Sequence, residues 1–171
     1  PFVVFCQELR GTPSPLSFAT LAAVVSLVGV PASMAGAETT TRVPRARLIV
    51  AVMLASIVAS LLVVPAALSS WVLLVAAVSI YSALISADSA ALTSGIVAVA
   101  PPASRGTAMA IYSTLGFAAA SGGTFVVGLM LDVLGGQSVT SWMVAFAVMS
   151  APNCIGALAV SRESKSRPRT S

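Results

Sequence analysis

Five apolar stretches dominate the sequence, and each is long enough to cross a membrane as a helix. They cover residues 17–37, 48–67, 72–100, 107–134 and 142–160. About 20 helical residues span the roughly 30 Å of hydrocarbon in a bilayer, so these stretches predict membrane-spanning helices. Residues 1–9 are apolar as well and indicate the end of a preceding span. Because the sequence begins inside that span and without a methionine, we expect a C-terminal fragment of a longer protein.

The composition supports a membrane protein, because hydrophobic residues make up 57% of the chain and charged residues only 8%. In soluble domains about a quarter of the residues are charged. Pro101 and Pro102 end the third stretch, since proline cannot continue the helical hydrogen bonds, and Gly135 and Gly136 end the fourth. We therefore predict an all-α, polytopic membrane helix bundle over residues 1–160, surrounded by the lipid bilayer, and a polar tail over residues 161–171.

The basic residues predict the topology. Arg42, Arg45, Arg47 and Arg105 lie in two loops between apolar stretches, and four more basic residues lie in the tail. With spans that cross in alternating directions, these eight fall on one side of the membrane, and only Arg10 falls on the other. Short basic loops stay in the cytoplasm, so we expect this side and the C-terminus to be cytoplasmic. Because the basic residues form no basic face with interleaved aromatic rings, we expect no nucleic-acid partner.

The side chains needed for catalysis or metal binding are missing from the sequence. It has no histidine, and its cysteines, Cys6 and Cys154, are far apart. No nucleophile and base, no paired acid and base and no cluster of metal ligands can be assembled from these residues. We predict that the protein is not an enzyme and has no cofactor, no catalytic residue and no metal site.

The third stretch carries the candidate transport residues. At 100° per residue, one half of this helix is polar, and its members are Tyr81, Ser82, Ser86, Asp88, Ser89 and Thr93. Such a face is unfavourable toward acyl chains and should point into the bundle or a water-filled cavity. Asp88 is the only ionisable side chain deep in a span. Three roles are open to it: a coupling-proton site or substrate contact, a structural hydrogen-bond acceptor, or a hydrated position near the inner mouth.

Small residues recur at intervals of four along the next stretch. Gly116, Ala120, Thr124 and Gly128 form a narrow ridge, and such ridges let membrane helices approach closely. We predict that the ridge packs against another helix, either as a static contact or as a surface along which helices move.

Two segments resemble the major facilitator superfamily of transporters. Residues 37–46 are similar to its loop signature G-x-x-x-D-R-x-G-R-[RK], with Arg42 and Arg45 on the two basic positions and Arg47 just beyond. The sequence departs from the signature at four positions: Ala37, Thr41, Pro44 and Ala46. Residues 87–136 resemble helices ten and eleven, with "RG" in the connecting loop and a closing G-x-x-x-D-x-x-G formed by Gly128, Asp132 and Gly135.

The resemblance implies that the chain is the second half of the superfamily fold, covering helices eight to twelve and the end of helix seven. It implies secondary transport of a small molecule by alternating access, coupled to an ion or to protons, with the N-terminal half of the protein as the main partner. It also implies a multi-pass protein of the cell membrane, in a bacterium the inner membrane. The alternative is a non-transporting multispan scaffold or assembly subunit.

Overall fold

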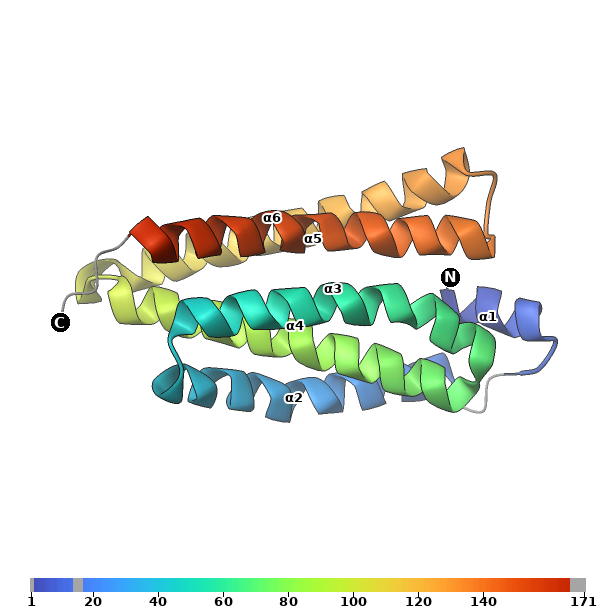
Figure 1. Cartoon of the computed structure of the whole chain (residues 1–171), viewed down its shortest axis with the longest axis horizontal. Coiled ribbons are helices and arrows are strands. Elements are labelled where there is room, and N and C mark those ends of the chain that lie inside the picture. Colours follow the sequence, from blue (N-terminus) through green and yellow to red (C-terminus); the bar gives the residue numbers. More distant parts are fainter. Residues whose placement is uncertain (1, 14–16, 167–171) are drawn as a thin grey trace.

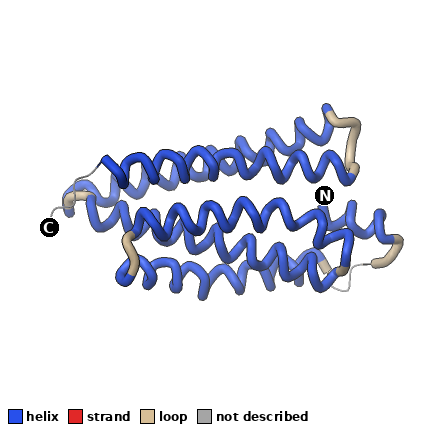
Figure 2. Tube along the Cα trace, viewed as in Figure 1, coloured by secondary structure: helices blue, strands red, loops and turns tan. Residues whose placement is uncertain are grey.

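The computed structural model describes residues 2–13 and 17–166, and in this part the chain forms helices and no strand. The helices are α1 (Phe2–Arg10), α2 (Phe18–Arg42), α3 (Arg45–Ser69), α4 (Trp71–Val99), the short 3₁₀ turn η1 (Pro102–Ser104), α5 (Arg105–Val133) and α6 (Val139–Ser166). Figure 2 shows that only short loops connect them. The helices α2 to α6 are long and apolar enough to cross a membrane. The predicted all-α, polytopic membrane helix bundle is therefore confirmed.

The long helices run up and down the bundle in alternating directions (Figure 1). The α2–α3 connection, the α4–α5 connection and the end of α6 lie at one end of the bundle. The α3–α4 and α5–α6 connections lie at the other end, together with α1. The two arginine-bearing loops therefore share one end, which is the arrangement that the charge pattern requires.

Helix ends follow the local sequence. Ser17 and Ser70 cap α2 and α4, because their hydroxyls accept hydrogen bonds from the backbone N–H of Thr20 and Leu73. Gly135 and Gly136 adopt φ values of 82° and 101°, which glycine tolerates, and they lead the chain out of α5. The helix α6 continues to Ser166, six residues past the predicted end of the last span at residue 160. Residues 167–171 of the predicted tail lie outside the described part.

The helix α4 packs most extensively against α2 and α3. Two glycines of α2 make the α2–α4 contact close. A Cβ added to Gly36 would lie 2.5 Å from the carbonyl oxygen of Ala87 and 2.7 Å from its Cα, and one added to Gly29 would lie 2.9 Å from Ser86 Oγ. The backbones of the two helices can approach this closely only because both positions lack a side chain.

A buried polar cluster joins α3 to α6. Ser60 and Ser150 share a hydrogen bond between their hydroxyls, and Asn153 Nδ2 donates to Ser56 Oγ at 3.0 Å. Ser56, Ser60 and Ser150 are all at least 96% buried. A buried hydroxyl or amide group is unfavourable when it has no hydrogen bond. These hydrogen bonds therefore allow polar side chains to lie between the two helices.

The helix α5 lies at the edge of the described bundle, and none of its residues is buried there. A Cβ added to Gly116 or Gly128 would meet nothing within 4 Å, and Ala120 and Thr124 are exposed. The predicted ridge thus faces no helix of the described residues, so its packing role stays a prediction.

Candidate functional site

An open groove with a volume of about 1120 Å³ lies between α2 and α4. Seven of its lining residues carry hydroxyl groups: Ser26, Ser33, Ser82, Ser86, Ser89, Thr93 and Ser94. We call this space the hydroxyl cavity. Its other walls are small or apolar residues, and Arg105 at the start of α5 is the only charged residue among those that line it in the described part.

The α4 wall of the hydroxyl cavity is an axial row of side chains. Ser82, Ser86, Ser89 and Thr93 are separated by three or four residues, so they stack along one side of the helix over about 16 Å. Gly29 of α2 lies opposite Ser86 and leaves its hydroxyl uncovered by a side chain. The close approach of α2 therefore forms the cavity rather than filling it.

The hydroxyls differ in their availability to a solute. Ser33 Oγ donates to the Val30 carbonyl at 2.8 Å, and Ser94 Oγ donates to the Ala91 carbonyl at 2.9 Å. Within the described residues, the hydroxyls of Ser86, Ser89 and Thr93 form no hydrogen bond. Each of them can donate one hydrogen bond and accept others, so this part of the wall can bind several kinds of polar group.

The predicted polar face of α4 divides into two. Ser82, Ser86, Ser89 and Thr93 line the hydroxyl cavity, whereas Asp88 and Tyr81 do not. Tyr81 lines a separate apolar pocket of about 290 Å³ with Phe2 and Phe146. Asp88 Oδ1 is buried and has no hydrogen-bond partner in the described part of the chain. The two groups of residues therefore do not form one site.

Asp88 lies on the side of α4 that turns toward α3. Ala91, three residues later, is 1% exposed and packs with Ile49 and Met53 of α3. Gly95, seven residues after Asp88, contacts the side chain of Arg45. A substrate contact by Asp88 inside the hydroxyl cavity is not supported by this placement.

The sequence analysis missed four polar lining residues, which are Ser26, Ser33, Ser94 and Arg105. Ser26 and Ser33 are seven residues apart, so the same helical projection applied to the first apolar stretch would have placed them on one face. The signal was present but weak, since isolated serines are common in membrane helices. Arg105 was assigned only to the basic loop.

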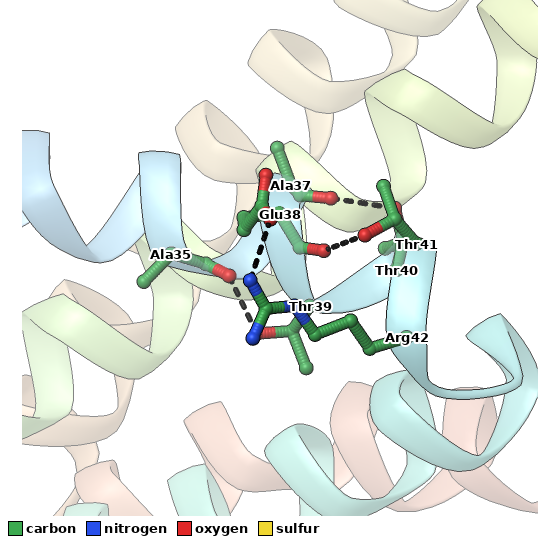
Figure 3. A network of polar contacts seen from close by, with 7 residues as sticks. All are labelled: Ala35, Ala37, Glu38, Thr39, Thr40, Thr41 and Arg42. Carbon is green, nitrogen blue, oxygen red and sulfur yellow. Dashed lines mark hydrogen bonds and ion pairs between the residues drawn. The ribbon is translucent and has the colours of Figure 1, made fainter.

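The predicted loop signature is mostly helical. Three threonine hydroxyls at the end of α2 donate to backbone carbonyls of their own helix: Thr39 to Ala35 at 2.6 Å, Thr40 to Ala37 at 2.6 Å and Thr41 to Glu38 at 2.7 Å. Figure 3 shows these contacts together with the ion pair between Arg42 and Glu38, at 3.2 Å. The helix α2 ends at Arg42, five residues past the predicted end of the first span at residue 37.

The three arginines of the signature lie in different surroundings. Arg42 is paired with Glu38 on the surface, and Arg47 is exposed. Arg45 lies across α4, with its Cδ 3.2 Å from the position of a Cβ on Gly95. Of these three arginines, only Arg45 contacts a neighbouring helix in the part of the chain that the structure describes.

The described residues contain no group of three or more His, Cys, Asp or Glu side chains that could hold a metal ion. Cys6 is buried and Cys154 is exposed, and both are free thiols. The arrangement of the site is that of a hydrogen-bonding cavity between membrane helices.

Comparison with known proteins gives one match. The family model described as Major Facilitator Superfamily matches residues 4–171. No match was found among curated proteins or among solved structures.

Proposed function

Because the chain belongs to the Major Facilitator Superfamily, a family of membrane transporters, we propose that it forms the C-terminal half of a secondary transporter. In this proposal the chain supplies helices eight to twelve and the end of helix seven. The protein moves a small polar solute by alternating access, and the N-terminal half closes the other side of the pathway. The protein has no catalytic role.

The observation that carries the proposal is the hydroxyl cavity. Hydroxyl groups that face lipid are unfavourable, whereas hydroxyl groups around a cavity inside the membrane can replace the water that a solute loses on entry. Ser86, Ser89 and Thr93 are the proposed solute contacts, because their hydroxyls have no hydrogen bond in the described part of the chain.

We propose that protons drive the transport and that Asp88 carries them. Asp88 is the only acidic or basic side chain in the middle of a described membrane helix. Since Asp88 and the hydroxyl cavity lie on different sides of α4, the proton and the solute do not share a contact. Coupling then requires a movement of α4 that both sites influence.

The proposed orientation follows from the basic residues. The end of the bundle that carries the α2–α3 and α4–α5 connections faces the cytoplasm, and so does the C-terminus. The membrane is the cell membrane, in a bacterium the inner membrane.

Transport by the complete gene product tests the proposal. The protein is reconstituted in liposomes and screened against small polar solutes with and without an imposed proton gradient. We expect one solute to accumulate only with the gradient. Thr93→Val should weaken its uptake at least tenfold, because it removes a hydroxyl and keeps the shape, whereas Thr140→Val at the start of α6 should leave uptake unchanged.

A protein that moves no solute under either condition would contradict the transport proposal and would favour the scaffold alternative. Equal uptake with and without the gradient would contradict only the proton coupling.

A further inference from the structure

Arg105 places a positive charge at one end of the hydroxyl cavity. It is the first residue of α5, and it lines the cavity together with Ala37 of α2 and with Val97 and Ala98 of α4. These lining residues belong to the end of the bundle that carries the α2–α3 and α4–α5 connections (Figure 1). A solute that enters the cavity from this end therefore passes Arg105 before it reaches the row of hydroxyls on α4.

The guanidinium group of Arg105 is held at one nitrogen only. Its Nε donates a hydrogen bond to the carbonyl oxygen of Ala100, just after the end of α4, at 3.2 Å. In the described part of the chain, Nη1 and Nη2 form no hydrogen bond and no ion pair, and the residue is exposed. Two adjacent guanidinium nitrogens match the two oxygens of a carboxylate. Arg105 can therefore bind an anionic group without losing its contact with the end of α4.

No acidic side chain among the described residues that line the cavity balances this positive charge. Glu38 follows the lining residue Ala37, but its carboxylate is paired with Arg42 at 3.2 Å. Asp88 lies on another side of α4 and does not line the cavity. An anionic solute would therefore meet a complementary charge at this end, whereas a cationic solute would be repelled.

The hydroxyl groups of the cavity do not distinguish between the two kinds of solute. Ser86, Ser89 and Thr93 can each donate a hydrogen bond to an anion or accept one from a cation. The charge of Arg105 is therefore the feature of the lining that favours one sign over the other.

We propose that the hydroxyl cavity selects anionic solutes, such as carboxylates, and that Arg105 sets this preference. The inference rests on the proposed transport function and adds the charge of the solute to it. Arg105 attracts the anionic group at the end of the cavity, and the hydroxyls of α4 donate hydrogen bonds to it farther along the path.

Charged thiol reagents measure this preference without a known solute. The complete gene product, with its native cysteines replaced, carries Ala98→Cys on the cavity wall and is studied in lipid nanodiscs, which leave both ends accessible. Reaction rates are measured with an anionic reagent, sulfonatoethyl methanethiosulfonate, and with a cationic one, trimethylammonioethyl methanethiosulfonate. Each rate is divided by the rate of the same reagent with free mercaptoethanol, which removes the intrinsic difference between the reagents.

We expect the anionic reagent to be favoured at Ala98→Cys. Arg105→Gln should lower the ratio of the anionic to the cationic rate at least about threefold at about 0.15 M salt, because a nearby unit charge acts on the two reagents in opposite directions. Arg105→Lys keeps the charge and should keep most of the preference. Arg47→Gln is the matched control, since Arg47 is exposed at the same end but does not line the cavity, and it should leave the ratio nearly unchanged.

A ratio that Arg105→Gln leaves unchanged would overturn the inference, and so would equal ratios in the Gln and Lys variants. Accumulation of a neutral or cationic solute in the liposome screen would also overturn it, while leaving the transport proposal intact. A thiol at Ala98→Cys that reacts with neither reagent would contradict the open cavity itself, and with it both this inference and the proposed function.

Discussion

At the scale of single residues, two glycines determine how closely α2 packs against α4. Gly36 and Gly29 bring α2 against α4, and this contact places the walls of the hydroxyl cavity. The two glycines differ in what a methyl group would meet. At Gly36 it would meet backbone atoms of Ala87, and at Gly29 it would meet only the hydroxyl of Ser86.

Alanine substitutions at these two glycines should therefore lower the stability of the protein by different amounts. Gly36→Ala forces α2 and α4 apart, and we expect it to destabilise the complete protein by about 1–3 kcal/mol, the usual range for overpacking. Gly29→Ala should cost less, since the Ser86 side chain can rotate away. Thermal unfolding in detergent measures both, and an equal loss for the two variants would contradict the close backbone contact at Gly36.

Asp88 gives the second prediction at this scale. Asp88→Asn keeps nearly the same volume and cannot release a proton, so it should abolish gradient-driven accumulation and leave solute exchange partly intact. Transport in liposomes with and without the gradient measures both activities. Full accumulation with an unaltered pH profile would exclude Asp88 as the proton carrier. Lower thermal stability with an unchanged pH dependence of transport would identify a structural acceptor instead.

The candidate site could be predicted only in part. The helical projection grouped Ser82, Ser86, Ser89 and Thr93, which all line the hydroxyl cavity, because side chains on one helix face follow from spacing alone. It could not separate them from Asp88, because a half-helix is wide enough to touch two neighbouring helices. Which neighbour lies on which side is set by tertiary contacts, here those of α2 and α3 with α4.

At the scale of helices, the number of spans and the all-α bundle follow from the lengths of the apolar stretches. The positions of the helix ends follow less well from the lengths of the apolar stretches. The first span was predicted to end at residue 37, but the helix α2 continues through the polar residues that follow and ends at Arg42. Contacts between helices were not predictable from periodicity, and the polar cluster between α3 and α6 is an example.

This polar cluster provides the prediction for the helix scale. Ser60→Ala and Ser150→Ala each remove one partner of the same buried hydrogen bond, so their effects should not add. Hydrogen bonds between membrane helices have coupling energies of about 0.6 kcal/mol on average, with a maximum of about 1.7. A double-mutant cycle, measured by unfolding of the complete protein in detergent, should give a value in this range.

Ser161→Ala serves as a control, since the Ser161 hydroxyl bonds only within α6 in the described part of the chain. The polar contact between α3 and α6 would be refuted by strictly additive effects of Ser60→Ala and Ser150→Ala.

At the scale of the whole molecule, α2, α3, α4 and α6 form the compact part, and α5 exposes large apolar surfaces. Such surfaces are compatible with a membrane and with further helices around this bundle. The chain's family match over residues 4–171 agrees with this architecture. The alternating helix directions also make a direct prediction of topology.

Reporter fusions should place the ends of the bundle on opposite sides of the membrane. A fusion at Pro44, between α2 and α3, and a fusion after Ser171 should both report the cytoplasm. A fusion at Gln137, between α5 and α6, should report the opposite side. If the fusions at Pro44 and Ser171 disagree, the number of spans is wrong.

The most direct test of the central claim is thiol modification inside the hydroxyl cavity. In the complete gene product with Cys154→Ser, Ser89→Cys introduces a reactive group on the cavity wall, and Gln137→Cys introduces one in the α5–α6 loop as a control. We predict that labelling with a bulky, water-soluble maleimide blocks uptake by the Ser89→Cys variant. The transported solute should slow the labelling of this cysteine. The labelled Gln137→Cys variant should still transport the solute. Undiminished uptake by fully labelled Ser89→Cys protein would contradict the assignment of the hydroxyl cavity as the solute pathway.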